Sequence, residues 1–302
     1  MSWFSIALIG PVLYSIANHT DKYVISKYLK NGQVGALIVF SALFSLIAVP
    51  IVLFIHPQVF TVSLVQAIAL GINAILVVIA VLLYFYALSL DEVSVVVPFY
   101  QTIPIFGFIL SYFILGETIT LIQTCASIIV ILGALALSFD LRRKKIRFKT
   151  SVVALMLTAS LLYAVNSVIF KFIALQDGFW PSTFWGFVGK GVLGLLFLLY
   201  VPYRKQFLKL IKTNRLTIMG LTSMSEGVFI IAESVMQYAT LLAPVTLVLL
   251  VNAFQPVFVL LIGVILTIIF PKIERESLRE KQLLQKIIGI GLIVIGSYFA
   301  GV

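Results

Sequence analysis

Four ionisable side chains, Lys171, Lys190, Glu226 and Glu233, lie within or near the ends of apolar stretches in the second half of the chain. A charge inside a bilayer is costly, so each is a candidate substrate contact or proton carrier if these stretches cross a membrane. Depth along the expected helices predicts two ion pairs, Lys190 with Glu226 and Lys171 with Glu233. Glu226 or Glu233 would bind a substrate ammonium or carry a coupling proton, and Lys171 would contact a substrate carboxylate. The alternative for each acid is a structural ion pair.

A set of neutral polar residues accompanies these charges. Glu226, Glu233 and Gln237 follow helical spacing, so their shared face must meet a cavity or another helix and not lipid. Other tyrosines and amides concentrate in the stretches expected to line a cavity, although each alone could form a helix-to-helix hydrogen bond instead. Two nearby prolines remove backbone donors and are expected to bend their helices. These candidates are Tyr14, Asn18, Asn73, Tyr84, Tyr86, Tyr100, Gln101, Tyr163, Asn166, Asn252 and Gln255, with the prolines Pro104 and Pro256.

Membrane-spanning helices would have to position these residues. The mean hydropathy is +1.16, 62% of residues are hydrophobic and only 11% are charged, which is far from the soluble norm. One span needs about 20 apolar residues, and the runs here do not alternate as barrel strands do. The sequence predicts an all-α membrane protein with ten transmembrane helices, at about 3–18, 34–55, 64–88, 94–115, 121–139, 151–173, 182–201, 216–241, 245–270 and 284–301.

The basic residues predict the orientation. Of 21 Lys and Arg, 19 lie in alternate connections between the spans or in the helix ends entering them. Basic residues in short loops stay in the cytoplasm, so both termini are predicted to lie outside the cytoplasm of an inner or plasma membrane. The net charge of +10 is explained by this arrangement facing anionic lipid, and we expect no nucleic-acid partner. The segment 202–215 alternates cations with apolar residues and predicts a helix lying in the interface.

Two related halves are visible in the sequence. The basic run at 142–150 is predicted to link a first five-helix repeat, residues 1–141, to a second, residues 151–302. Tyr14 aligns with Tyr163, which places Lys22 on Lys171; Lys22 is therefore a candidate too, unless it reaches the headgroups. Tyr86 aligns with Tyr238 and Gly133 with Gly296. Five spans per half predict an inverted repeat, the usual architecture of secondary transporters.

One motif resembles a known family. The stretch YALSLDEVSVVVPFYQTIPIFGFILSYFILGETIT, residues 86–120, is similar to the EamA-like branch of the drug/metabolite transporter superfamily in its tyrosine–alanine pair, mid-helix proline and terminal Leu115, Gly116 and Glu117. The second copy keeps Tyr238, Ala239 and Pro256 but lacks the Leu-Gly-Glu. The resemblance implies a central cavity lined by spans one, three, four, six, eight and nine, and export or exchange of amino acids and other small metabolites. It also implies that both termini lie in the cytoplasm, whereas the charge pattern predicts that they lie outside. Our topology prediction follows the charge pattern.

These features predict a secondary transporter of small organic metabolites that works by alternating access, and not an enzyme. No Walker-type phosphate-binding loop is present. The alternatives are an intramembrane enzyme acting on a lipid-linked substrate, for which Asp91 and Glu92 are the only adjacent acids in a short loop, and a channel or structural membrane subunit. His19, His56 and Cys125 are scattered, so we expect neither a metal site nor a cofactor. Glu117 is expected to be a surface acid. The predicted partners are a small-molecule substrate and membrane lipid.

Overall fold

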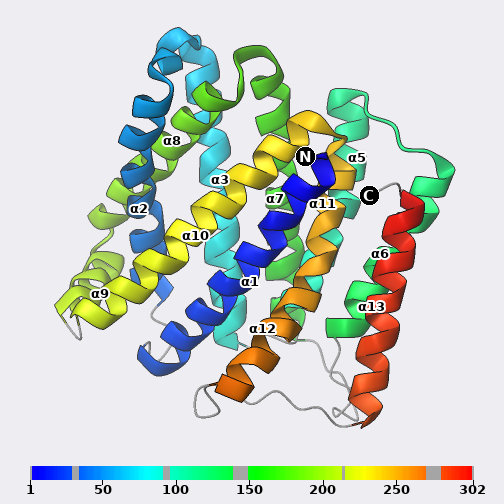
Figure 1. Ribbon diagram of the computed structural model, residues 1–302. Helices are drawn as coiled ribbons and strands as arrows, with labels where there is room; N and C mark the ends of the chain where they lie inside the picture. The colour runs from blue at the N-terminus through cyan, green and yellow to red at the C-terminus, as the bar shows by residue number, and fades with distance from the viewer. Residues whose placement is uncertain are drawn as a thin grey trace.

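The chain folds into helices, with no strand in the part that the structure covers (Figure 1). This computed structural model describes residues 2–28, 34–90, 96–138, 149–212, 215–269 and 280–300. Short 3-10 segments, labelled η, interrupt the α-helices at three places. The elements are α1 Trp3–Tyr28, α2 Val34–Ile55, η1 Pro57–Thr61, α3 Leu64–Leu90, η2 Val97–Thr102, α5 Ile103–Leu115, α6 Leu121–Ser138, α7 Thr150–Asp177, α8 Phe179–Leu199, α9 Val201–Lys212, α10 Arg215–Leu242, α11 Val245–Val251, η3 Asn252–Phe254, α12 Gln255–Ile269 and α13 Glu280–Ala300.

Length and composition allow six of the described helices to cross a membrane: Gly35–Ile55, Leu64–Leu90, Thr150–Asp177, Phe179–Leu199, Thr217–Leu242 and Val245–Leu266. Three more are apolar but shorter, at Phe99–Leu115, Leu121–Ala136 and Gln285–Ala300. The all-helical membrane fold is thus confirmed for the described residues, whereas the count of ten spans stays a prediction. The first helix falls outside both groups, and the second half of α1 contains a polar run from Asn18 to Lys22.

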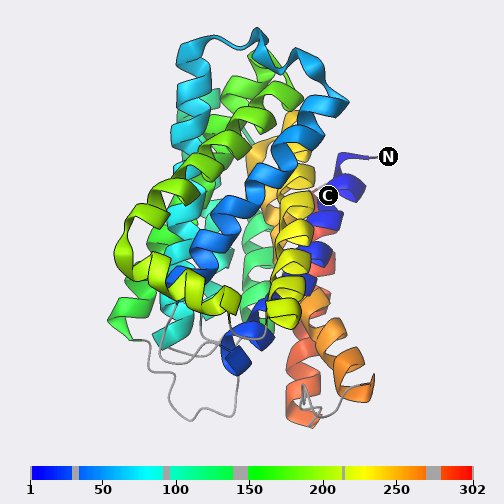
Figure 2. The same cartoon turned by 90° about the vertical axis from the view of Figure 1, so that its left-hand side faces the viewer.

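The two ends of the bundle differ in charge. At the lower edge of Figure 1, α1, α3, α6 and α12 finish and α2, α7, α10 and α13 begin. We call this edge the basic end, because the described lysines and arginines other than Lys171 and Lys190 belong to these helix ends or to α9. Figure 2 shows α9 crossing this end between α8 and α10. The other edge is called the opposite end. The predicted linker lies outside the described residues, except for Lys149 and Thr150.

Helices from the two halves pack against one another. The most extensive contacts pair α1 with α10, α3 with α7, α2 with α8 and α6 with α13. In the sequence alignment of the halves, α1 corresponds to α7, α2 to α8, α3 to α10 and α6 to α13. The α1–α10 contact therefore corresponds to the α3–α7 contact, whereas the α2–α8 and α6–α13 contacts each join two corresponding helices. Many large apolar side chains on the outer faces of the helices are exposed, including Ile51, Phe54 and Leu64. An apolar exterior around small residues at helix contacts is the arrangement that lipid requires.

The α6–α13 contact is reciprocal to the residue. A Cβ on Gly133 would lie 2.8 Å from the carbonyl oxygen of Gly289 and 3.0 Å from the backbone nitrogen of Ile293. A Cβ on Gly296 would lie 2.9 Å from the carbonyl oxygen of Ala126 and 3.0 Å from the backbone nitrogen of Val130. The offset that aligns Gly133 with Gly296 also aligns Ala126 with Gly289. On each helix, therefore, the absence of a side chain at the glycine lets the partner's backbone approach closely, and the two partner segments occupy aligned positions.

A second correspondence links the α3–α7 and α1–α10 contacts. The Asn73 amide on α3 donates to the carbonyl of Asn166 on α7 at 3.1 Å, and the Asn166 amide donates to the carbonyl of Asn73 at 3.3 Å. At the aligned positions, the Ser225 hydroxyl on α10 donates to the carbonyl of Ala17 on α1 at 3.4 Å. The aligned residues thus make a corresponding contact in each half.

Candidate functional site

A cavity of about 110 Å³ lies between the halves, bounded by α1, α2, α3, α7, α10, α11 and the 3-10 segments η2 and η3. On a comparable measure one water needs roughly 10–15 Å³, so the space suits a small organic solute. Its lining mixes carboxylates, amides, tyrosine hydroxyls and aromatic faces, contributed by both halves. Twelve of the predicted site residues line it: Tyr14, Asn18, Tyr84, Tyr100, Gln101, Tyr163, Asn166, Glu226, Glu233, Gln237, Asn252 and Gln255.

The other five predicted candidates lie elsewhere. Asn73 is bonded to Asn166 across the α3–α7 contact. Lys22 is exposed near the basic end of α1. Tyr86 is partly exposed and its hydroxyl lies 3.0 Å from that of Tyr203 on α9. Lys171 and Lys190 are buried but do not line the main cavity. A substrate-binding role for any of these candidates stays a prediction.

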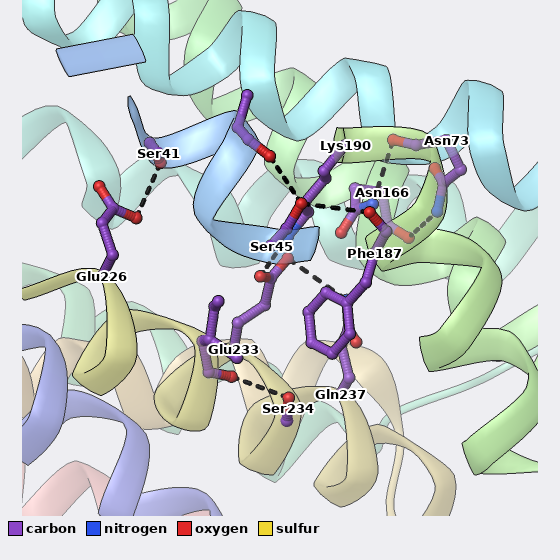
Figure 3. Close-up of polar contacts among 12 residues, drawn as sticks. Ser41, Ser45, Asn73, Asn166, Phe187, Lys190, Glu226, Glu233, Ser234 and Gln237 are labelled. Atoms are coloured by element: carbon purple, nitrogen blue, oxygen red, sulfur yellow. Dashed lines mark hydrogen bonds and ion pairs between the residues drawn. The ribbon is translucent and has the colours of Figure 1, made fainter. Parts of the chain in front are cut away.

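The predicted pairing of Lys190 with Glu226 is wrong. The Lys190 ammonium binds the Glu233 carboxylate, which also accepts a hydrogen bond from Gln237 at 3.5 Å (Figure 3). The helix α8 begins at Phe179, three residues before the expected start, so Lys190 lies about 16 Å from the opposite end of its helix. Glu233 lies about 14 Å and Glu226 about 24 Å from the same end of α10, which makes Glu233 the nearer match in depth.

The predicted pairing of Lys171 with Glu233 is also wrong. Lys171 forms an ion pair with Glu117, and it donates to the carbonyl of Ala243 at 2.8 Å. The second Glu117 oxygen accepts from the backbone N–H of Val245, the first residue of α11, at 2.8 Å. Both charged side chains are largely buried, 9% and 14% exposed, so the expectation of a surface acid at Glu117 is wrong too. This network joins α7, the end of α5 and the turn between α10 and α11.

Gly116 explains how Glu117 reaches this position. It ends α5 in the left-handed region with φ +66°, a conformation that glycine adopts without a Cβ penalty. The chain therefore turns back toward the bundle, and the carboxylate meets the free N–H groups at the start of α11. In the Leu-Gly-Glu motif, the glycine thus ends α5 and the glutamate caps the start of α11.

Two further carboxylates enter the cavity without a lysine or arginine of the described residues bound to them. The Glu226 side chain on α10 points toward α2, where the Ser41 hydroxyl donates to it at 2.8 Å (Figure 3). Asp21 on α1 accepts from the Ser225 hydroxyl at 2.6 Å. The two acids lie within electrostatic range of each other, and Lys190 is within range of Glu226 while bound to Glu233. These acids lie on the side of the cavity nearer the basic end.

Aromatic rings form much of the remaining lining. Tyr100 on η2 lies between Tyr84 on α3 and Tyr163 on α7, with ring centroids 5.4 Å and 5.8 Å away. Across the cavity, Tyr14 on α1 lies 5.3 Å from Phe229 on α10. Ring pairs at these separations attract each other and hold their faces in place. The cavity is therefore bounded by ring faces and hydroxyls as well as by acids.

The two predicted helix-bending prolines each follow a 3-10 segment. Pro104 is the second residue of α5, directly after η2, and Pro256 is the second residue of α12, directly after η3. Gln101 and Gln255 lie at these interruptions and line the cavity. Asn252, the first residue of η3, lines the cavity too, and its buried side-chain oxygen Oδ1 has no hydrogen-bond partner within the described ranges. The interruption at η3 thus brings an unsatisfied acceptor to the cavity.

The site prediction missed the acid that completes this lining. Asp21 adjoins Lys22 near a helix end and resembles an interfacial residue in sequence. Its spacing from Tyr14 and Asn18, at i+7 and i+3, is the signal that places it on the same helix face. Ser41 and Ser225 carry no comparable signal. Asp91 and Glu92 lie outside the described residues, and no group of three His, Cys, Asp or Glu within the described ranges is arranged to hold a metal ion.

Comparisons with known proteins identify a family match over the first part of the chain and a solved structure with a similar fold. Residues 2–139 match the family described as EamA-like transporter family, which confirms the resemblance over that part of the chain. One solved structure, described only as a crystal structure of a protein, is 17% identical with a TM-score of 0.68, and the match covers 99% of this chain and 95% of that one. At this identity the match shows a shared fold. No curated protein matches the chain.

Proposed function

We propose that this chain, which belongs through residues 2–139 to the EamA-like transporter family of membrane transporters, is a secondary carrier that exchanges or exports a small organic solute by alternating access. The observation that carries the proposal is a cavity rich in polar groups, lined by both halves inside an apolar helical shell. Such a space is expensive to maintain in lipid unless solute or water occupies it.

The contacts between the halves support an inverted repeat of ten spans. The reciprocal glycine contact of α6 and α13, and the corresponding polar contacts of Asn73 and Ser225, follow the alignment of the two halves. Figure 1 shows α1 running from the opposite end to the basic end, whereas its counterpart α7 runs the other way. Secondary carriers built in this way bind substrate where their repeats meet and rock one unit against the other.

Contacts nearer the opposite end support a state that is closed on that side. There Gly71 on α3 approaches Gly189 on α8 so closely that a Cβ on Gly189 would lie 2.5 Å from the Gly71 Cα. The Asn73–Asn166 bonds and the Lys171–Glu117 pair reinforce this side. The corresponding pair, α2 and α10, makes far fewer contacts than α3 and α8. If the basic end is cytoplasmic, as the charges predict, the cavity is poised to open inward and both termini lie outside.

Exchange across a liposome membrane tests the proposal. The full chain would be reconstituted with an unlabelled solute inside, and uptake of the same labelled solute would be followed over a panel of amines, amino acids and other small metabolites. A carrier gives transient accumulation at carrier rates and none in empty liposomes. Absence of exchange across the panel, or steady flux at channel rates, would contradict it. Repeating the assay with a proton ionophore tests proton coupling, because an unchanged rate excludes it.

Cysteine labelling tests the orientation independently. A single cysteine would be placed at Ser2 or Thr213 in a chain in which Cys125 is replaced by serine. An impermeant maleimide added to intact cells should label the first position and spare the second. The reverse pattern would place the basic end outside.

A further inference from the structure

The cavity contains more negative charge than the described part of the chain neutralises. Three acids line it, Asp21, Glu226 and Glu233, and one lysine, Lys190, is bound to Glu233. Asp21 and Glu226 are each held by one serine hydroxyl, and no lysine, arginine or histidine in the described ranges lies within salt-bridge distance of either. Glu226 is 8% exposed. Two neighbouring carboxylates in such surroundings need either a cation or protons between them.

The aromatic lining discriminates between kinds of cation. Tyr84 and Tyr163 lie on the same cavity as the two acids, so an ammonium at the acids can have an apolar body against ring faces. Aromatic rings attract organic cations through their faces, and they offer few ligands to a hydrated metal ion. The buried Oδ1 of Asn252, which lines the cavity without a hydrogen-bond partner in the described ranges, indicates independently that a polar ligand is accommodated, because buried polar groups are normally hydrogen-bonded.

A substrate carboxylate has no comparable partner among the described residues that line the cavity. The two lysines buried in the bundle are bound elsewhere, Lys190 to Glu233 and Lys171 to Glu117 near the opposite end. An anion in the cavity would face Asp21 and Glu226 with amides and hydroxyls alone. Like charges in a poorly solvated site repel strongly. The lining therefore favours a solute with net positive charge over an anion, and over a zwitterion such as a neutral amino acid.

We propose that the cavity binds a small aromatic or apolar organic cation, whose ammonium lies between Asp21 and Glu226 and whose body lies against the tyrosines. The proposal rests on the proposed function and narrows its substrate class. A cavity of about 110 Å³ corresponds to roughly ten water-sized positions, which suits a solute of about nine non-hydrogen atoms such as 2-phenylethylamine.

Four probes that share a phenyl ring but differ in charge test how much the ammonium contributes to binding. Calorimetry on the full chain in nanodiscs would compare 2-phenylethylamine, 2-phenylethanol, phenylalanine and 3-phenylpropionate, which are a cation, a neutral compound, a zwitterion and an anion. The amine should bind at least about tenfold more tightly than each of the others. Equal or tighter binding of the alcohol, zwitterion or anion, or no binding of the amine, overturns the proposal. This comparison uses the unaltered chain, so it does not depend on a variant folding.

Variants then locate the ammonium. Asp21→Asn and Glu226→Gln should each weaken amine binding at least about tenfold while leaving the alcohol unchanged. The matched control is Asp177→Asn, which removes a carboxylate that does not line the cavity and should leave amine binding unchanged. Unchanged amine affinity in both cavity variants overturns the assigned site.

Exchange of the same four solutes distinguishes the two proposals. If liposomes containing the protein exchange the zwitterion or the anion but not the amine, the carrier function stands and the substrate class is wrong. If the amine binds as expected but no solute is exchanged, the cation site stands and transport is wrong. Exchange of the amine alone supports both.

Discussion

The contact between α1 and α10 and the contact between α3 and α7 occupy corresponding places in the two halves. At the first, Ser225 donates to a carbonyl across the contact, as Asn73 does at the second. Beside Ser225 lie two acids, Asp21 and Glu226. The aligned positions on the other side are Phe170 and Ala74, which are apolar. The two contacts therefore resemble each other, whereas the acids that line the cavity next to Ser225 have no counterpart at the aligned positions.

The helix pairs that flank these contacts differ in a second way. Glycines bring α3 and α8 into backbone contact, whereas between α2 and α10 the Phe44 ring lies 4.0 Å from where a Gly227 Cβ would be. A further acid, Glu233, aligns with Val81 and is neutralised by Lys190. The two sides therefore differ in their acids, in the lysine that neutralises Glu233 and in the distance between the flanking helices. Substitutions at these contacts test the differences.

Glu233→Gln should have the largest effect, because it leaves the Lys190 ammonium buried without its counter-ion. Removing one partner of a buried pair typically costs about 3–5 kcal/mol. Thermal unfolding in detergent should show a large loss of stability. The double variant Lys190→Met with Glu233→Met should recover most of it, since an apolar pair of similar volume avoids desolvation. A single variant as stable as the parent would show that the pair contributes nothing to the fold.

Glu117→Gln should cost about 2–3 kcal/mol, because the Lys171 pair is lost and the cap at Val245 is weakened. The effect should be smaller than at Glu233 because glutamine can still accept from the Val245 N–H. Limited proteolysis within the turn between α10 and α11 should accelerate with it. A variant with parental stability and parental cleavage would contradict the assigned network.

Gly189→Ala and Gly227→Ala compare the two flanking contacts directly. At Gly189 the added methyl meets the Gly71 backbone and should cost about 1–3 kcal/mol. At Gly227 it meets open space near Phe44, and the helix should gain up to about 1 kcal/mol in intrinsic propensity. Chemical unfolding of both variants measures the difference. Equal effects would remove the distinction between the two contacts.

Ser225→Ala and Asn73→Ala should produce the smallest changes, each about 1 kcal/mol. Their difference lies in function. Ser225 also donates to Asp21, so its loss should alter solute binding, whereas Asn73→Ala should leave binding unchanged. Measuring unfolding and amine binding on both variants separates these contributions. If both variants lost amine binding equally, residues at both helix contacts, α1–α10 and α3–α7, would contribute to the binding site.

The apolar segments predicted the helices well because hydropathy reports directly on burial in lipid. The third span, expected at 64–88, is observed as α3 Leu64–Leu90, and the segment at 202–215 forms the helix α9 Val201–Lys212. The first span was expected to end at residue 18, yet α1 continues to Tyr28. Its polar residues ended the apolar run but not the helix, because Asn18 and Asp21 face the cavity and His19 contacts Val259 on α12.

The pairing of charges could not be predicted in the same way. Depth along a helix fixes one coordinate of a side chain, while its partner depends also on rotation and on which helices are neighbours. Glu233 and Glu226 differ by two turns on one face. The expected pairing compared the depth of Lys190 from one end with the depth of Glu226 from the other, whereas depths counted from the same end match Lys190 to Glu233. The burial of Glu117 could not be predicted for a different reason. Its burial depends on the turn at Gly116, which brings a residue outside the span back against the bundle.

The reciprocal fit of α6 and α13 has a consequence for assembly. Each of these helices supplies both the glycine and the surface that receives its partner's glycine, so the interface needs no covalent connection to be specific. A chain divided within residues 139–148 and produced as two fragments should therefore rejoin through this seam. The join between the halves would then serve to fix their ratio and order of insertion, while recognition resides in the helices themselves.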